Sequence, residues 1–178
     1  MANDDAPPDR RRFLKAATGV IGGGVGLVLA APVLRFVIDP AGETTVTSPT
    51  EPIDLGAADR FVVGADPQRV DVIAPVVKDA WTSAKNVVLG AAWVRRTGPD
   101  KIVAFSAVCP HLGCAIGWDP AKKTYLCPCH DSRFAVEGDK LSGPSERGLD
   151  ELKLAVKDGR LQLVWKRFKY GGSTPEPA

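Results

Sequence analysis

The sequence predicts a mainly β domain that follows a single N-terminal membrane-spanning helix. Three observations predict this fold class: an uncharged apolar run near the N-terminus, 18 Gly and 15 Pro residues that break helices, and short alternating apolar runs that turn back on themselves. With 178 residues, the chain has room for one ordinary domain plus appendages. Its net charge of +2 is too small to indicate nucleic acid as a partner.

The first 15 residues end in a basic cluster, RRRFLK at positions 10–15. An arginine pair, one further residue and then Phe-Leu-Lys is similar to the twin-arginine export signal, which a receptor reads. The alternative is a merely basic flank on a hydrophobic helix. We expect residues 1–15 to form a cytoplasmic N-terminus with a twin-arginine signal.

An uncharged run over residues 16–34 follows the basic cluster. As a helix it would extend about 28 Å, close to the roughly 30 Å of a bilayer core. Because basic residues precede it, we expect a single-pass anchor over 16–38 in a bacterial cytoplasmic membrane, with the N-terminus cytoplasmic and the rest on the outer side. A cleaved signal peptide is the alternative, with a cut after Ala30-Ala31 that Pro32 disfavours.

Residues 39–52 are rich in Pro, Thr, Gly and Ser and are expected to form a flexible linker. A soluble domain is expected over 53–170, and the tail GGSTPEPA at 171–178 is expected to be disordered. Two apolar runs, 87–94 and 102–108, flank a turn at 97–100, and alternating residues on both sides of 157–160 predict a second hairpin. Residues 53–85 contain no motif that we can match.

All four cysteines and both histidines lie between residues 109 and 130, in the boxes CPHLGC (109–114) and CPCH (127–130). Chance clustering of this kind is very improbable, so the pattern indicates a metal site. A tetrahedral zinc needs only four ligands, and Cys-x-His is not its common spacing. A two-iron, two-sulfide cluster with two cysteines on one iron and two histidines on the other uses the pattern directly.

CPHLGC and CPCHDS resemble the Rieske iron–sulfur proteins, and the additional cysteine pair resembles the Rieske subunits of cytochrome bc-type quinol–cytochrome c oxidoreductases. The resemblance implies a Rieske-type antiparallel β-sandwich with a cluster-binding subdomain of two loops, and one [2Fe-2S] cluster. It makes Cys109 and Cys127 the ligands of the inner iron. His111 and His130 become the ligands of the outer iron, and Cys114 and Cys129 form a disulfide.

The resemblance also assigns residues that tune the cluster. Ser132 matches the family serine whose hydroxyl donates a hydrogen bond to a cluster sulfur, and Gly143-Pro144 resembles the start of the family's proline loop, although Glu146 replaces its second proline. Many members have glycine in place of Asp131 and tyrosine in place of Phe134. Both departures are expected to lower the reduction potential, towards a more reducing quinol such as a menaquinol.

The implied function is that of an electron-transfer subunit in a membrane quinol–cytochrome c reductase, with cytochrome b-type and cytochrome c-type subunits, the quinol and the membrane as partners. His130 and His111 are the expected catalytic residues. One exposed imidazole, with His130 the expected quinol contact, would accept a hydrogen bond from the quinol and take up the proton as the electron passes through iron. In such complexes the cluster domain swings between partners, so the linker over 39–52 is expected to be either a mobile tether or only a spacer.

Three alternatives remain. The small subunit of arsenite oxidase resembles this chain in its export signal and its two boxes, but it receives electrons from a molybdenum partner. Rieske ferredoxins and ring-hydroxylating oxygenases generally lack the additional cysteine pair. A structural zinc module is the non-redox alternative.

Overall fold

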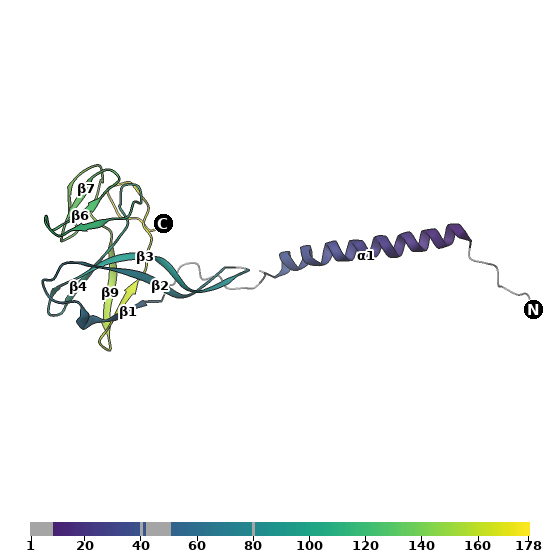
Figure 1. Cartoon of the computed structure of the whole chain (residues 1–178), viewed down its shortest axis with the longest axis horizontal. Helices are drawn as coiled ribbons and strands as arrows, with labels where there is room; N and C mark the ends of the chain where they lie inside the picture. The colour runs from purple at the N-terminus through teal and green to yellow at the C-terminus, as the bar shows by residue number, and fades with distance from the viewer. Residues whose placement is uncertain (1–8, 40, 42–50, 80) are drawn as a thin grey trace, which may run out of the picture. The chain divides into compact units, whose positions relative to one another are not determined.

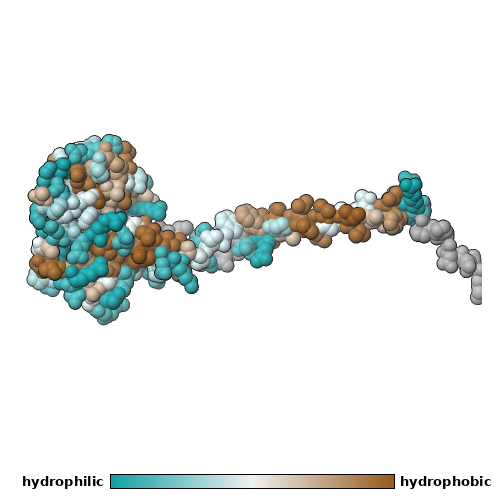
Figure 2. Space-filling view, viewed as in Figure 1, coloured by the Kyte–Doolittle hydropathy of each residue, from teal (hydrophilic) through white to brown (hydrophobic). Residues whose placement is uncertain are grey.

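The N-terminal helix α1 runs from Arg10 to Ile38 in the computed structural model, which describes residues 9–39, 41, 51–79 and 81–178 (Figure 1). It begins before the predicted anchor because the basic residues form its first turns, and the side chain of Asp9 caps it by accepting the N–H of Arg11. None of its residues is buried, and apolar residues follow one another along it (Figure 2). The helix is long and apolar enough to cross a membrane. Most of the linker predicted over 39–52 lies outside the described residues.

The described part of the domain, a structural unit distinct from α1, contains two antiparallel sheets. The six strands of the larger sheet, in spatial order, are β1 (Ile53–Ala57), β10 (Arg160–Val164), β9 (Glu151–Lys157), β4 (Lys101–Ser106), β3 (Ser83–Gly98) and β2 (Gln68–Lys78). A short 3-10 helix, Ala58–Arg60, follows β1. The smaller sheet has the order β5 (Gly117–Asp119), β6 (Thr124–Cys127), β7 (Ser132–Ala135) and β8 (Lys140–Ser142).

The larger sheet curls so that its edge strands β1 and β2 contact each other. Inward-facing residues of all six strands then share one core, in which Val72, Leu161 and Leu163 are completely buried. Along β1 and β10, buried and more exposed residues alternate, which is the pattern of a sheet with one face in a core. The antiparallel β-sandwich predicted from the sequence is confirmed.

Both predicted hairpins are present. β3 and β4 pair around the turn at 97–100, and β9 pairs with β10 across Asp158 and Gly159, whose φ angles of 50° and 71° suit a two-residue hairpin turn. The stretch 53–85, in which the sequence shows no matching motif, supplies β1, β2 and the start of β3. Phe61 and Val72 from this stretch are among the most buried residues of the core.

Trp81 contacts the C-terminal part of α1. The Trp81 ring stacks on Phe36 with 5.3 Å between ring centroids, and its indole N–H donates to the Phe36 carbonyl at 3.3 Å. Trp81 therefore belongs to the same structural unit as the helix.

The smaller sheet is an insertion between two neighbouring strands of the larger one. Phe105 of β4 faces Glu151 of β9, and the N–H of Ser106 donates to the carbonyl of Asp150 at 2.8 Å. Everything from residue 107 to residue 149 lies between these paired positions. A second core holds the insertion to the sheet, with Phe105 and Trp93 from the large sheet and Tyr125 and Phe134 from the small one.

The C-terminal tail makes backbone hydrogen bonds with the residues just before it. The N–H of Lys169 donates to the carbonyl of Glu176, and the N–H of Ala178 donates to the carbonyl of Arg167, so the tail turns back on residues 167–169. Gly171 and Gly172 make this reversal possible because their φ angles of 69° and 73° suit glycine.

Candidate metal centre

The first loop of the candidate site (residues 107–116) follows β4 and contains the first cysteine–histidine box. The N–H of Cys109 donates to the carbonyl of Cys114 at 2.7 Å, and the N–H of Gly113 donates to the carbonyl of Cys109 at 2.9 Å. Gly113 has a φ of 81°, a left-handed conformation that closes the turn at little cost only for glycine. These bonds hold Cys109 inside the protein, at 1% exposure, while His111 remains half-buried.

The second loop (residues 128–131) connects β6 to β7. Cys127 ends β6 and pairs directly across the ladder with Ser132, which begins β7. Between them the chain turns through Asp131, which has a φ of 56°. The turn leaves Cys127 buried at 1% exposure and His130 exposed to solvent.

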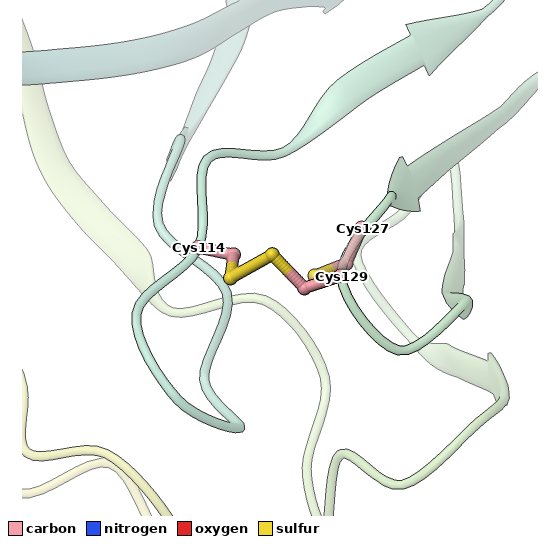
Figure 3. A group of neighbouring side chains, drawn as sticks. All are labelled: Cys114, Cys127 and Cys129. Atoms are coloured by element: carbon pink, nitrogen blue, oxygen red, sulfur yellow. A yellow bond between two sulfur atoms is a disulfide. The ribbon is translucent and has the colours of Figure 1, made fainter.

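A disulfide between Cys114 and Cys129 joins the two loops, with their Cα atoms 6.5 Å apart (Figure 3). This is the pair that the resemblance assigned to a disulfide. The sulfur of Cys127 lies beside the bond, since the three sulfur atoms are all within 4.8 Å of one another. Because one covalent bond ties both loops together, the residues around it keep a fixed mutual position.

The remaining potential ligands are two thiols and two imidazoles. All four cysteines are in the described part of the chain, and Cys109 and Cys127 are the free ones. Burial raises the pKa of the Cys109 thiol to about 11, and the adjacent Cys127 contributes. Such a thiol deprotonates readily only when a cation such as iron stabilises the thiolate.

The two histidines are more exposed than this pair of thiols. Their ring centroids are 5.0 Å apart with the rings nearly perpendicular, so both can face one ion. The donor set is therefore asymmetric, with buried sulfur donors on one side and more exposed nitrogen donors on the other. A [2Fe-2S] cluster with two thiolate and two imidazole ligands fits these residues.

Ser132 is completely buried and pairs with Cys127 across the β6–β7 ladder. Its oxygen accepts the N–H of Ser145 at 3.2 Å, so the hydroxyl proton is free to point elsewhere. Gly143 packs directly on Ser132, because a Cβ added to Gly143 would lie 2.4 Å from the Ser132 Cα. The next residue, Pro144, is exposed. The segment 143–145 thus covers Ser132 and fixes its orientation.

Asp131 has an ionic partner that the sequence reasoning missed. Arg133 donates to the Asp131 carboxylate at 3.3 Å and also lies 3.9 Å from a carboxylate oxygen of Asp119. The Arg133 side chain is 25% exposed and that of Asp131 is 76% exposed, so water also screens the acid. The negative charge of Asp131 beside His130 is therefore weaker in its effect than its position in the sequence indicated. A carboxylate two residues before an arginine was the available signal.

Phe134 is completely buried in the second core, across the ladder from Tyr125. A phenyl ring has no hydroxyl to donate, so this side chain contributes apolar packing alone. The cysteines and histidines that the sequence singled out lie on the two loops or at the end of β6, and Ser132 and Gly143 pack against each other beside them. Ser145 and Arg147, which hold the segment over Ser132, had no recognisable signal.

Comparison with known proteins gives a consistent set of relatives. The family model of the Rieske [2Fe-2S] domain matches residues 74–153. The menaquinol:cytochrome c reductase iron–sulfur subunit of Geobacillus thermodenitrificans is 34% identical over 167 residues, which cover 92% of this chain and 95% of that protein. The subunit of the same name from Bacillus subtilis is 33% identical over 158 residues, covering 86% and 90%.

Solved structures also match. The plasma membrane Rieske protein of Synechocystis PCC 6803 has a TM-score of 0.44 and 22% identity, covering 62% of this chain and 97% of that one. A chain of a hyperthermophilic respiratory Complex III has a TM-score of 0.40 and 22% identity, covering 84% of this chain and 99% of that one.

Proposed function

Because this chain belongs to the Rieske [2Fe-2S] family, we propose that it is the iron–sulfur subunit of a bc-type quinol–cytochrome c reductase, with menaquinol as the electron donor. The observation that supports this most strongly is the similarity to the Geobacillus menaquinol:cytochrome c reductase subunit, which extends over nearly the whole length of both chains. The partners are then a cytochrome b-type subunit, a cytochrome c-type subunit and the quinol.

The cofactor of the domain is one [2Fe-2S] cluster. We assign Cys109 and Cys127, the buried thiols, to the inner iron, and His111 and His130, the more exposed imidazoles, to the outer iron. The bound cluster supplies a one-electron acceptor whose potential is raised because two ligands are neutral imidazoles. The disulfide holds both ligand loops in place, and the free hydroxyl proton of Ser132 can stabilise added negative charge by hydrogen bonding.

The histidines give the electron transfer its coupling to protons. An imidazole that held iron through one nitrogen would keep its second nitrogen for hydrogen bonding, and added negative charge at the site would favour protonation of that nitrogen. Since His130 is exposed and His111 is half-buried, His130 is the better placed to accept a hydrogen bond from quinol. The ring would hold the quinol proton at this nitrogen until it is released to water.

Two residues adjust the site to a low-potential quinol. Phe134 cannot donate the hydrogen bond that a tyrosine would, and this lowers the potential. The contribution of Asp131 is smaller, because Arg133 pairs with its carboxylate. We therefore attribute most of the lowering of the reduction potential to Phe134.

The domain organisation follows from α1. We propose a retained single-pass anchor in a bacterial cytoplasmic membrane, with the twin-arginine cluster on the cytoplasmic side and the residues from 53 onward on the outer side. The segment 39–52 is proposed to act as a tether that lets the cluster domain move between the quinol site and the cytochrome acceptor.

The alternatives are less well supported. The Geobacillus and Bacillus relatives are both subunits of menaquinol:cytochrome c reductases. With the disulfide formed, a zinc module and a [2Fe-2S] cluster would both use the remaining two thiols and two imidazoles, but Cys-x-His is not the common spacing of zinc ligands.

The test is to purify the full-length chain from its native membranes in mild detergent. We expect b-type and c-type haem in the same complex, an electron-spin signal from the reduced cluster, and menaquinol-dependent reduction of cytochrome c. Co-purification with a molybdopterin subunit would refute the proposal. Over the pH range in which reduction is accompanied by uptake of one proton, the midpoint potential should fall by up to about 59 mV per pH unit. A potential that is constant from pH 6 to pH 10 would exclude the coupling.

A further inference from the structure

A buried ion pair lies beside the site, in the segment between β8 and β9. Arg147 and Asp150 are 7% and 5% exposed, and the guanidinium donates to both carboxylate oxygens, at 2.8 Å and 2.9 Å. A buried pair of this kind is costly unless its remaining hydrogen-bonding groups are also satisfied. The remaining donors of Arg147 are satisfied by a different part of the chain.

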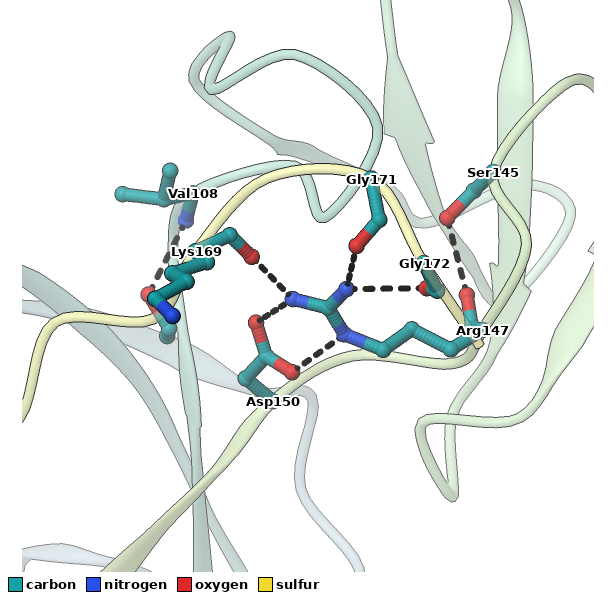
Figure 4. A network of polar contacts seen from close by, with 8 residues as sticks. Val108, Ser145, Arg147, Asp150, Lys169, Gly171 and Gly172 are labelled. Atoms are coloured by element: carbon teal, nitrogen blue, oxygen red, sulfur yellow. Dashed lines mark hydrogen bonds and ion pairs between the residues drawn. The ribbon is translucent and has the colours of Figure 1, made fainter. Parts of the chain in front are cut away.

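These donors bind residues 169–172, which we name the C-terminal clasp. Figure 4 shows the guanidinium between the Asp150 carboxylate and three backbone carbonyls of the clasp. The acceptors are the carbonyl oxygens of Lys169 at 2.7 Å, Gly171 at 2.5 Å and Gly172 at 3.0 Å. One side chain therefore fixes the path of a segment that lies more than 20 residues away in the sequence.

The clasp in turn contacts the first loop of the site. The N–H of Gly171 donates to the carbonyl of Pro110 at 2.8 Å and to that of His111 at 3.1 Å. The ring of Tyr170 lies against Gly113, where an added Cβ would come within 2.7 Å of it. The clasp thus covers the loop that holds Cys109 and His111.

Arg147 is connected to the second loop as well. Its carbonyl accepts the hydroxyl of Ser145 at 2.8 Å, and the N–H of Ser145 donates to the buried oxygen of Ser132. The side chain of Arg147 therefore holds the clasp that contacts the first loop, and its backbone carbonyl binds Ser145, which in turn contacts Ser132 after the second loop.

We propose that Arg147 is a positioning residue of the redox centre, which sets the reduction potential by holding the C-terminal clasp against the first loop. The inference rests on the proposed function as a [2Fe-2S] electron carrier. The Gly171 N–H donates a hydrogen bond to the backbone of the first loop, which contains His111, and the positive end of this N–H dipole favours added negative charge at the site. The guanidinium adds a positive charge that favours the reduced, more negative state.

Arg147 remains protonated, and therefore positively charged, at physiological pH. The hydrogen bond to Asp150 raises the pKa of Arg147, and the charges of Asp150 and Cys109 act in the same direction, against the lowering effect of burial. The guanidinium is therefore a fixed cation, and its influence on the site does not vary with pH.

The experiment compares three changes in the full-length chain. Arg147→Met removes the cation and its donors, and truncation after Phe168 removes the clasp but leaves the Arg147–Asp150 pair. Arg160→Met is the matched control, because Arg160 also pairs with an aspartate, Asp54, but on the surface. Midpoint potentials and electron-spin spectra of the reduced cluster are measured, together with the rate of trypsin cleavage after Lys169 in the untruncated variants.

We expect both site variants to have lower midpoint potentials and altered spectra, with the larger change in Arg147→Met because it loses the cation as well. Cleavage after Lys169 should accelerate at least about tenfold in Arg147→Met, since several charge-assisted hydrogen bonds protect this backbone. Arg160→Met should match the wild type in all three measurements. Loss of the cluster from the truncated chain, with its sheets intact by circular dichroism, would also support the inference.

Faster cleavage in Arg147→Met with wild-type potentials and spectra in both site variants would overturn it, since the clasp would then be only structural. If Arg147→Met does not fold, the truncated chain decides alone, and a wild-type potential there overturns the inference. A wild-type chain without any cluster would instead refute the proposed function.

Discussion

Substitution of Gly143 by alanine should damage the site through Ser132. Gly143 has a φ of 89°, and a Cβ there would lie 2.4 Å from the Ser132 Cα and 2.8 Å from both the Ser132 amide nitrogen and its hydroxyl oxygen. Two of these three atoms are backbone atoms within β7, so they cannot rotate away. Either the segment over Ser132 lifts or the start of β7 shifts, and both break the contact that orients the hydroxyl.

Gly143→Ala should lower the free energy of unfolding for two reasons. An alanine held at positive φ costs roughly 1–2 kcal/mol, and forcing a methyl group into a packed region adds roughly 1–3 kcal/mol. Gly159 is a matched control, because it has a φ of 71° but nothing within 4 Å of its added Cβ. Gly159→Ala should therefore show only the first effect, and the two variants should differ by roughly 1–3 kcal/mol. For a domain of this size, that difference corresponds to about 4–12 °C in melting temperature.

The assay is thermal unfolding followed by circular dichroism at one heating rate, with a redox titration of each variant. Gly143→Ala should melt below Gly159→Ala and should have a lower midpoint potential, since the Ser132 hydroxyl loses its alignment. Gly159→Ala should keep the wild-type potential because the β9–β10 turn is outside the site. Equal melting temperatures in the two variants would refute the reasoning about the contact with Ser132.

Three further predictions concern the disulfide, the core and the surface. Replacing Cys114 and Cys129 together by serine should speed the loss of cluster absorbance, and an unchanged rate of loss would contradict this. The free energy of unfolding should fall by less than the roughly 3 kcal/mol expected for a disulfide that closes a loop of this length, because the bound cluster also connects the two loops. Phe134→Tyr should raise the midpoint potential by restoring a hydroxyl near a cysteine sulfur, and an equal or lower value counts against the tuning argument. The hydrogen bond from Arg160 lowers the pKa of Asp54, so this pair stabilises the fold above the unfolded pKa of about 3.9 and loses its effect as the pH falls through the lower folded value. Asp54→Asn should therefore reduce the melting temperature at pH 7 but not at pH 2, and a loss of equal size at both values would disprove the assignment.

The parts of the fold that were predictable are those with local signals. The hairpin of β9 and β10 has alternating apolar residues on both sides of Asp158-Gly159. The signals for both strands and for the turn therefore lie within 14 consecutive residues, 151–164. The metal site was equally visible, because cysteine and histidine are scarce in this chain and all of them fall in two boxes. Both signals depend on short sequence separations.

The remainder depends on contacts between distant segments. β1 pairs with β10, and the Asp54–Arg160 bond on that ladder joins residues 106 positions apart, which no local pattern encodes. The tail was expected to be disordered because its composition is typical of disorder. In the structure the carbonyls of Gly171 and Gly172 in the tail accept hydrogen bonds from the buried Arg147, 24 and 25 positions away. An arginine between a glycine–proline loop and a strand showed no sign of that role.

The two ends of the insertion that contains both cysteine–histidine boxes leave and re-enter the larger sheet side by side, at Ser106 and Asp150. Its length and content can therefore change without shifting the register of any strand in the six-stranded sheet. The insertion is also free to open as a separate cooperative unit, because the sheet beneath it has its own core. Amide hydrogen exchange should then divide the domain into two classes, with slower exchange in β3, β9 and β10 than in β5 to β8 once the cluster is removed. A chain built in this way can lose its redox centre and still retain a folded scaffold that is able to receive a new one.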